Sequence, residues 1–186
     1  MSIPITLPGM HGPAAGFDEP FELLAGCHDR VRRSLTLLKR LADRVASEGA
    51  DAKAQAAARD VLRYFDLAAP AHHEDEERHV VPLLAASADP TLVAAASRLL
   101  QDHEAIRAAW QSLRPLLLPV AEAARCDDDA ALAAAAERFI SVHDGHLELE
   151  DGLVFPAAAR LHPDHAAMGR EMAQRRGVDT ARKRGG

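Results

Sequence analysis

Apolar side chains recur every three or four positions in four long stretches of this chain, with polar residues between them. This spacing is typical of α-helices that bury one face, because 3.6 residues make one helical turn. In the first stretch the apolar face consists of Phe21, Leu24, Val31, Leu35, Leu38, Ala42 and Val45. The pattern predicts an all-α fold, an up-down-up-down four-helix bundle with a short C-terminal helix.

Capping residues and prolines mark the ends and interruptions of the expected helices. The expected starts are Asp18–Pro20, Asp51, Asp89–Pro90 and the acidic run 127–129, and Gly49 ends the first helix. Proline lacks an N–H and its ring collides with the preceding turn. We therefore expect Pro70 and Pro82 to interrupt the second helix, and Pro115 and Pro119 to disturb the last turns of the third.

The periodic pattern also divides the chain. Residues 1–17 carry Gly and Pro without a helical period, and we expect an extended N-terminal arm there. Residues 18–162 form the predicted bundle, and residues 163–186 a short helix followed by a polar tail.

One pattern of histidine, glutamate and proline occurs twice in the chain. Its members are displaced by 74 positions and pair as His72/His146, Glu76/Glu150 and Pro82/Pro156. His28 and His103, on the apolar faces of the first and third helices, form a further pair displaced by 75 positions. These displacements indicate a duplicated helical hairpin, in which each half supplies one His from its first helix and a His-x-x-x-Glu from its second.

Four histidines and two carboxylates on the inner faces of one bundle predict a dinuclear metal site. A His and a Glu four residues apart lie on the same face of a helix, so both can reach one metal ion. Imidazole and carboxylate ligands suit iron, manganese or zinc. Burying so many titratable groups without a metal would cost several kcal/mol per uncompensated charge. The predicted ligands are His28, His72, Glu76, His103, His146 and Glu150.

Two registers compete in the second helix, because His73 and Glu77 have the same spacing as His72 and Glu76. The duplication favours His72 and Glu76, since Glu76 precedes its proline by six residues, as the repeat requires. His73, Glu74 and Glu77 are then alternate ligands or neighbours that support the ligands. His79 and His143 also fall on core stripes, and each is a candidate for a fifth ligand, a proton relay or a gate, against a structural role.

Net charge, cysteine content and the length of apolar stretches limit the partners and the cellular location that we expect. A net charge of -6 gives no reason to expect nucleic acid or an anionic membrane as a partner. Two cysteines without a Cys-x-x-Cys argue against a disulfide framework and against a thiolate zinc site. The N-terminus lacks a signal-peptide pattern, and no apolar stretch approaches the roughly 20 residues of a membrane span. We expect a cytoplasmic protein with a small-molecule ligand, and its oligomeric state stays open.

At these motifs the chain resembles the hemerythrin-like (HHE cation-binding) domains, over roughly residues 18–161. The matching segments are CHDRVRRSL, HHEDEERHVVPLL, QDHEAIRAAW and HLELEDGLVFP. The resemblance implies a non-heme centre with two irons per chain and an oxo or hydroxo bridge; zinc or manganese fits the same shell. The four histidines of the repeat would be terminal ligands, and Glu76 and Glu150 would bridge the two irons.

Two positions depart from the oxygen-carrying hemerythrins. Those carriers have a second His four residues after the third-helix His, where this chain has Arg107. They also have an Asp five residues after the fourth-helix His, where this chain has Glu150 at four and Asp151 adjacent. Both differences point away from reversible oxygen carriage and towards bacterial HHE proteins linked to nitric oxide, oxygen, peroxide or iron handling.

Three classes of function follow from this resemblance. The favoured one is a protein that binds or senses dioxygen, nitric oxide or peroxide, or that handles iron. The alternative is an enzyme that reduces nitric oxide or decomposes peroxide in oxidative stress, with His79 or His143 transferring protons. In the third class the metal mainly stabilises the fold.

Overall fold

The computed structural model describes residues 16–161 and 163–178. The predicted N-terminal arm up to residue 15, His162 and the tail from residue 179 lie outside the described residues. All regular elements within those ranges are helical, so the predicted all-α class is confirmed. Over the same part of the chain, no helix is long and apolar enough to cross a membrane.

The helical elements follow one another with short links. In chain order they are α1 (Pro20–Glu48), α2 (Ala52–Arg63), the π-helical turn η1 (Tyr64–Ala68), α3 (Ala69–His79), α4 (Val81–Ala85), α5 (Pro90–Ala123), α6 (Asp129–Leu149), the π-helical turn η2 (Glu150–Val154), α7 (Phe155–Arg160) and α8 (His165–Arg175). Side chains of Asp51, Asp89 and Asp128 accept hydrogen bonds from the first turns of α2, α5 and α6. At α1, the capping position is Glu19 rather than the expected Asp18, and its side chain makes no capping hydrogen bond.

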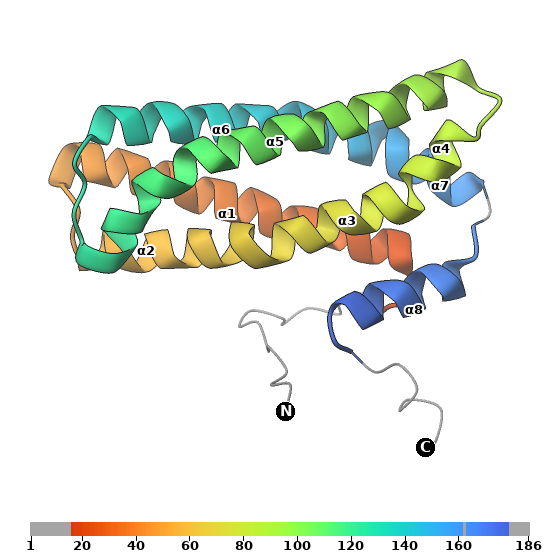
Figure 1. Cartoon of the computed structure of the whole chain (residues 1–186), viewed down its shortest axis with the longest axis horizontal. Coiled ribbons are helices and arrows are strands. Elements are labelled where there is room, and N and C mark those ends of the chain that lie inside the picture. The colour runs from red at the N-terminus through yellow and green to blue at the C-terminus, as the bar shows by residue number, and fades with distance from the viewer. Residues whose placement is uncertain (1–15, 162, 179–186) are drawn as a thin grey trace.

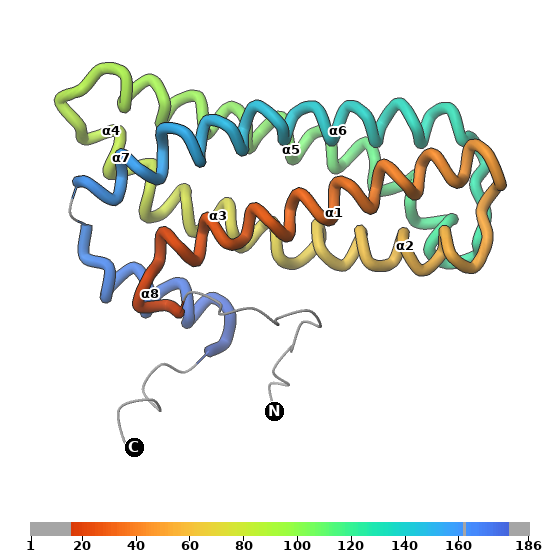
Figure 2. The backbone as a smooth tube through the Cα atoms, turned by 180° about the vertical axis from the view of Figure 1, so that it is seen from behind, coloured from red at the N-terminus to blue at the C-terminus, as the bar shows by residue number. Residues whose placement is uncertain are grey.

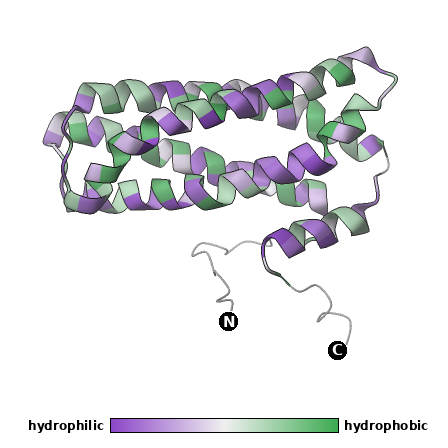
Figure 3. Ribbon diagram, viewed as in Figure 1, coloured by the Kyte–Doolittle hydropathy of each residue, from purple (hydrophilic) through white to green (hydrophobic). Residues whose placement is uncertain are grey.

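Two antiparallel hairpins build the bundle (Figure 1). One consists of α1 and the continuous run from α2 to α3, and the other of α5 and α6. The hairpins pack so that α1 lies beside α6 and α2 beside α5, as the reverse view also shows (Figure 2). Hydrophobic and hydrophilic residues alternate around each helix, which is the pattern of helices with one buried face (Figure 3). The four-helix bundle predicted from the sequence is therefore present.

Two apolar clusters fill the bundle, one towards each end. The cluster near the α1–α2 link includes Val31, Leu38 and Leu113. The cluster at the opposite end includes Leu24 and Leu99, together with residues of α4, α7 and α8. The boundary between them on α1 falls between Leu24 and Val31, the interval that holds His28. A polar layer therefore separates two apolar halves of the core.

The prolines of the second helix act as expected, through local changes in hydrogen bonding. Pro70 follows η1, in which the Ala69 N–H donates to the carbonyl of Tyr64, five residues earlier. The same wide turn precedes Pro156 in the second half, as η2. A proline cannot donate to an α-helical ladder, so the ladder shifts by one residue in the turn before it. At Pro82 the helix instead breaks between α3 and α4.

The prediction for Pro115 and Pro119 is wrong, because α5 continues through both to Ala123. Pro115 is exposed and Pro119 is only partly buried, so water can reach the carbonyl groups that lose a donor. On the opposite face Leu113 and Leu117 are fully buried and hold the helix against its neighbours. Packing of this face outweighs the lost hydrogen bonds.

The C-terminal helix α8 packs over the start of α1 and against α3. A Cβ atom on Gly169 would lie 1.7 Å from the carbonyl oxygen of Phe17, so only glycine permits this approach. Asp75 of α3 is fully buried, and Arg175 and Arg176 of α8 each approach its carboxylate to 2.6 Å. Two arginines at the end of α8 thus tie this helix to the one that carries His72 and Glu76.

Candidate metal centre

Histidines and glutamates of the polar layer form two groups that could each hold a metal ion. In the first group, His28 comes from α1, His72 and Glu76 come from α3, and Glu150 from η2. One ligand atom from each residue lies within 4.8 Å of those of the other three. All four residues are buried, so water does not satisfy them freely.

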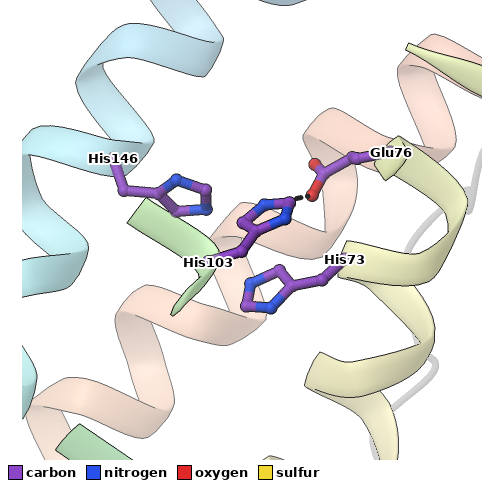
Figure 4. A group of neighbouring side chains, drawn as sticks. All are labelled: His73, Glu76, His103 and His146. Atoms are coloured by element: carbon purple, nitrogen blue, oxygen red, sulfur yellow. Dashed lines mark ion pairs between the residues drawn. The ribbon is translucent and has the colours of Figure 1, made fainter. Parts of the chain in front are cut away.

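The second group consists of His73 and Glu76 from α3, His103 from α5 and His146 from α6 (Figure 4). It meets the same distance criterion, and its members are also buried. Glu76 belongs to both groups. The two candidate positions are therefore adjacent and share one carboxylate.

The two carboxylates each lie between histidines of different groups. Glu76 Oε1 lies 3.2 Å from His72 Nε2, and Glu76 Oε2 lies 3.3 Å from His103 Nε2. Glu150 Oε1 lies 3.2 Å from His146 Nε2, and Glu150 Oε2 lies 3.0 Å from His28 Nε2. Each glutamate thus presents one oxygen to each group, which is the arrangement of a carboxylate that bridges two cations.

Buried polar atoms without a hydrogen-bond partner test whether these residues fit a metal. Among the described residues, most such side-chain atoms belong to the six predicted ligands. They include both oxygens of Glu76 and of Glu150, and Nε2 of the four predicted histidine ligands. Leaving buried donors and acceptors unsatisfied costs about 1–3 kcal/mol each. A cation between these atoms would satisfy them together, so the donor set fits a metal site.

Burial also shifts the protonation equilibria of these groups. Burial raises the pKa of Glu76 well above its usual range, and the nearby Glu150 raises it further. Burial and neighbouring histidines lower the pKa values of His72 and His73 well below the usual range. Burial lowers the pKa of His146 to about 3. These three histidines are neutral at pH 7 and available to a cation, which would also favour the ionised form of Glu76.

A carboxylate outside the cluster orients His103. The Nδ1–H of His103 donates to Glu77 Oε1 at 2.8 Å, which turns Nε2 towards Glu76. Arg107 donates to the same Glu77 oxygen at 3.0 Å. Burial would raise the pKa of Glu77, but the hydrogen bonds from Arg107 and His103 outweigh it, and the pKa is lowered. Glu77 therefore stays ionised and holds the ring of His103 in place.

His28, the repeat partner of His103, has the same kind of neighbours: a carboxylate that orients its ring and an arginine that contacts this carboxylate. Its Nδ1–H donates to Asp151 Oδ1 at 2.7 Å, and Arg32 donates to Asp151 Oδ2 at 2.6 Å. Burial would raise the pKa of Asp151, but hydrogen bonds from Arg32 and His28 outweigh it and lower the pKa. Each half of the duplicated hairpin thus contributes a histidine and an arginine, and the carboxylate that both of them contact comes from the other half.

We expect Glu77→Gln to weaken metal binding at the second group by about 10–100-fold, because an outer carboxylate fixes the ring and raises the basicity of a ligating histidine. Competition with a chelator of known affinity would measure the change. Glu74→Gln is the matched control, since Glu74 lies three residues earlier and its carboxylate pairs only with Arg78 on the surface among the described contacts. Equal affinities for the two variants would contradict the orienting role of Glu77.

The structure brings the six predicted ligands together, and it adds His73. The sequence presented His72 and His73 as alternatives, yet the two side chains lie in different groups on either side of Glu76. Glu77 lies outside both groups and contacts His103 from behind. From the local sequence one can say only that His72 and His73, as neighbours on a helix, point about 100° apart. In the bundle both directions lead to other ligand residues, because the polar layer is wide enough for two metal positions.

The remaining candidates lie outside both groups. Glu74 is exposed. His79 accepts a hydrogen bond from Arg175 at 2.7 Å, on the side of α3 that faces α8. His143 is buried and donates from Nδ1 to the carbonyl oxygen of Phe139 at 2.8 Å. His143 lies next to His146, with ring centroids 6.5 Å apart.

Sequence reasoning missed the paired roles of Arg32 and Arg107, although the necessary signal was present. Arg32 and Arg107 are displaced by the same 75 positions as His28 and His103. Glu77 and Asp151 are displaced by 74 positions and are both acidic. Extending the repeat beyond the histidines and glutamates would have identified these pairs.

Comparisons with known proteins agree with this geometry. Residues 19–158 match the family model of the hemerythrin HHE cation binding domain. A protein of Haemophilus influenzae (strain ATCC 51907 / DSM 11121 / KW20 / Rd), described as uncharacterized, is 33% identical over 165 residues. The matched region covers 88% of this chain and 94% of that relative.

Proposed function

Since the chain belongs to the hemerythrin HHE cation-binding domain family, we propose that it holds two iron ions and binds or senses dioxygen or nitric oxide there. The observation that carries this proposal is the shared carboxylate of two adjacent, buried donor groups. A single-ion site would not need Glu76 and Glu150 to face a histidine of each group.

In this proposal each of the two groups would hold one iron. His28 and His72 would hold one iron, and His73, His103 and His146 the other, with Glu76 and Glu150 between them. Imidazole and carboxylate donors suit iron. The bound irons would supply a redox change and open coordination positions for a small ligand. The chain itself would orient the ligands through Glu77 and Asp151 and exclude water with the apolar clusters on either side.

Metal analysis and optical spectroscopy test this proposal on the full chain. Protein purified from iron-supplemented cells is expected to contain about two irons per chain and to show oxo-bridge absorption. Addition of nitric oxide, or of air to the reduced protein, is expected to change that spectrum. One zinc or no metal per chain, with no spectral response to either gas, would overturn the proposal.

The same samples separate the other two functions. Catalytic consumption of nitric oxide or peroxide, over many equivalents and dependent on the iron, would favour an enzyme. A purely structural metal predicts that a chelator unfolds the protein and that small ligands leave the spectrum unchanged.

A further inference from the structure

A pocket of about 170 Å³ lies between α3 and α5. Its lining includes apolar side chains that are buried in the bundle, among them Phe65, Ile106 and Phe139. It also includes charged side chains that reach solvent, namely Glu74, Glu77 and Arg107. A concave apolar surface with a few polar groups is the usual form of a small-molecule site.

The ring of His73 also lines this pocket, although the residue is only 7% exposed. One ring nitrogen can serve the second group, and the ring stacks on that of His103 with centroids 4.2 Å apart (Figure 4). None of the described residues makes a hydrogen bond with the His73 ring, and neither of its nitrogens is among the fully enclosed atoms that lack a partner. A small polar group in the pocket can therefore reach an imidazole nitrogen that the described residues leave unsatisfied.

Two other predicted ligands have an outer partner that His73 lacks. Nδ1 of His28 donates to Asp151 at 2.7 Å, and Nδ1 of His103 donates to Glu77 at 2.8 Å. A ligating histidine usually donates its second N–H to an oxygen atom in this way. For His73 the pocket occupies this place, so a bound molecule with an oxygen acceptor can complete the pattern.

The charged side chains at the pocket are already paired with one another or with neighbours. Arg107 contacts Glu77 at 3.0 Å and Glu104 at 2.7 Å, and Glu74 contacts Arg78 at 2.7 Å. An anion in the pocket would meet two carboxylates, and a cation would meet the guanidinium of Arg107. Either one would also lose hydration against the apolar lining. The pocket therefore favours an uncharged molecule.

Aromatic rings give the pocket a fixed wall. The Nε1–H of Trp110 donates to Asp66 Oδ1 at 3.0 Å, which holds the indole in place. The ring of Phe65 packs against those of Trp110 and Phe139, with centroid distances of 5.3 and 4.8 Å. An apolar cavity of about 150 Å³ can hold benzene, so this pocket has room for one aromatic ring.

We infer that this pocket binds a small, uncharged organic molecule with one aromatic ring and a carbonyl oxygen, which accepts a hydrogen bond from the ring of His73. The aromatic ring of the ligand lies against Phe65 and Trp110, as such rings prefer offset or edge contacts with one another. The carbonyl holds the imidazole of His73 as Glu77 holds that of His103. Binding in the pocket does not rest on the proposed function, because these contacts need no iron.

Calorimetric titration of the full chain, as purified, tests the inference with acetophenone as the ligand. Benzoate and benzylamine have a similar size but carry a charge. Acetophenone is expected to bind saturably, and about tenfold or more tightly than either charged molecule. Fluorescence of Trp110, the single tryptophan of the chain, is expected to change with the same midpoint.

Two substitutions locate the ligand. Ala69→Leu enlarges a side chain of the pocket lining and is expected to weaken acetophenone binding about tenfold or more, because the added atoms occupy the space of the ligand. Ala56→Leu, the same change at an exposed position of α2, should retain the wild-type affinity. His73→Phe keeps a ring but removes the donor, so acetophenone should bind about three- to tenfold more weakly. Ethylbenzene, which lacks the carbonyl, should bind this variant as well as it binds the wild type.

The inference is wrong if the wild type shows no saturable binding of acetophenone, if a charged molecule binds as tightly, or if Ala69→Leu and Ala56→Leu bind equally. Equal effects of His73→Phe on acetophenone and ethylbenzene would refute the hydrogen bond to His73. Acetophenone binding by protein that holds no iron would contradict only the proposed function, and two irons per chain without acetophenone binding would contradict only this inference. If a pocket variant does not fold, the comparison of ligands on the wild type still decides.

Discussion

Glu76→Gln is expected to remove metal from both positions, whereas His28→Ala is expected to leave about one ion bound, because only Glu76 belongs to both groups. The loss of affinity should exceed the roughly 10–100-fold effect of outer residues such as Glu77. Metal-to-protein ratios after desalting would measure both variants. Glu74→Gln, an exposed change two residues earlier, is the control and should retain the wild-type ratio.

Glu76→Gln is expected to weaken metal binding but not to lower the stability of the metal-free protein. Both oxygens of Glu76 are buried without a hydrogen-bond partner, and burial raises the pKa of this carboxyl well above its usual range. An amide carries no charge to desolvate, so chelated Glu76→Gln should unfold at a temperature no lower than that of the chelated wild type. A variant that keeps two ions would contradict the bridging role of Glu76, and one that loses metal-free stability would contradict the cost assigned to its buried carboxyl group.

Replacing both Arg175 and Arg176 by Ala is expected to lower the free energy of unfolding by about 3–5 kcal/mol, because it leaves the buried carboxylate of Asp75 without either arginine that contacts it. The side chain of Arg175 is only 14% exposed, so solvent screens this pair weakly. Urea unfolding of the chelated protein would measure the loss without a contribution from metal. Arg170→Ala, an exposed change on the same helix, should have little effect.

A further substitution at Asp75 distinguishes a broken ion pair from simple loss of packing. Replacing a buried pair by apolar residues is often neutral, whereas removing one partner leaves an uncompensated charge. Adding Asp75→Leu to the variant that lacks both arginines should therefore recover part of the lost stability. If the variant without both arginines is as stable as Arg170→Ala, α8 is not tied to α3 through Asp75.

Much of the site follows from local rules that the sequence contains. A helical face repeats every 3.6 residues, so the apolar positions of α1, α2, α5 and α6 predict their buried faces directly. The spacing of His72 and Glu76 places both on one face of α3, because residues four apart are neighbours on a helix. The 74-residue displacement then transfers this result to His146 and Glu150. These predictions needed no knowledge of how the helices pack.

The sequence by itself determined the helical class, the bundle and the histidines and glutamates that face its core. Only the tertiary structure decided that His72 and His73 lie in different groups and that Arg175 reaches Asp75 across 100 residues. It also decided that α5 passes through Pro115, because packing on its buried face outweighs a local cost. The physical reason is the sequence separation over which each interaction acts. Periodicity and capping act within one or two helical turns, whereas shared ligands and buried ion pairs depend on side chains that meet only when the helices pack.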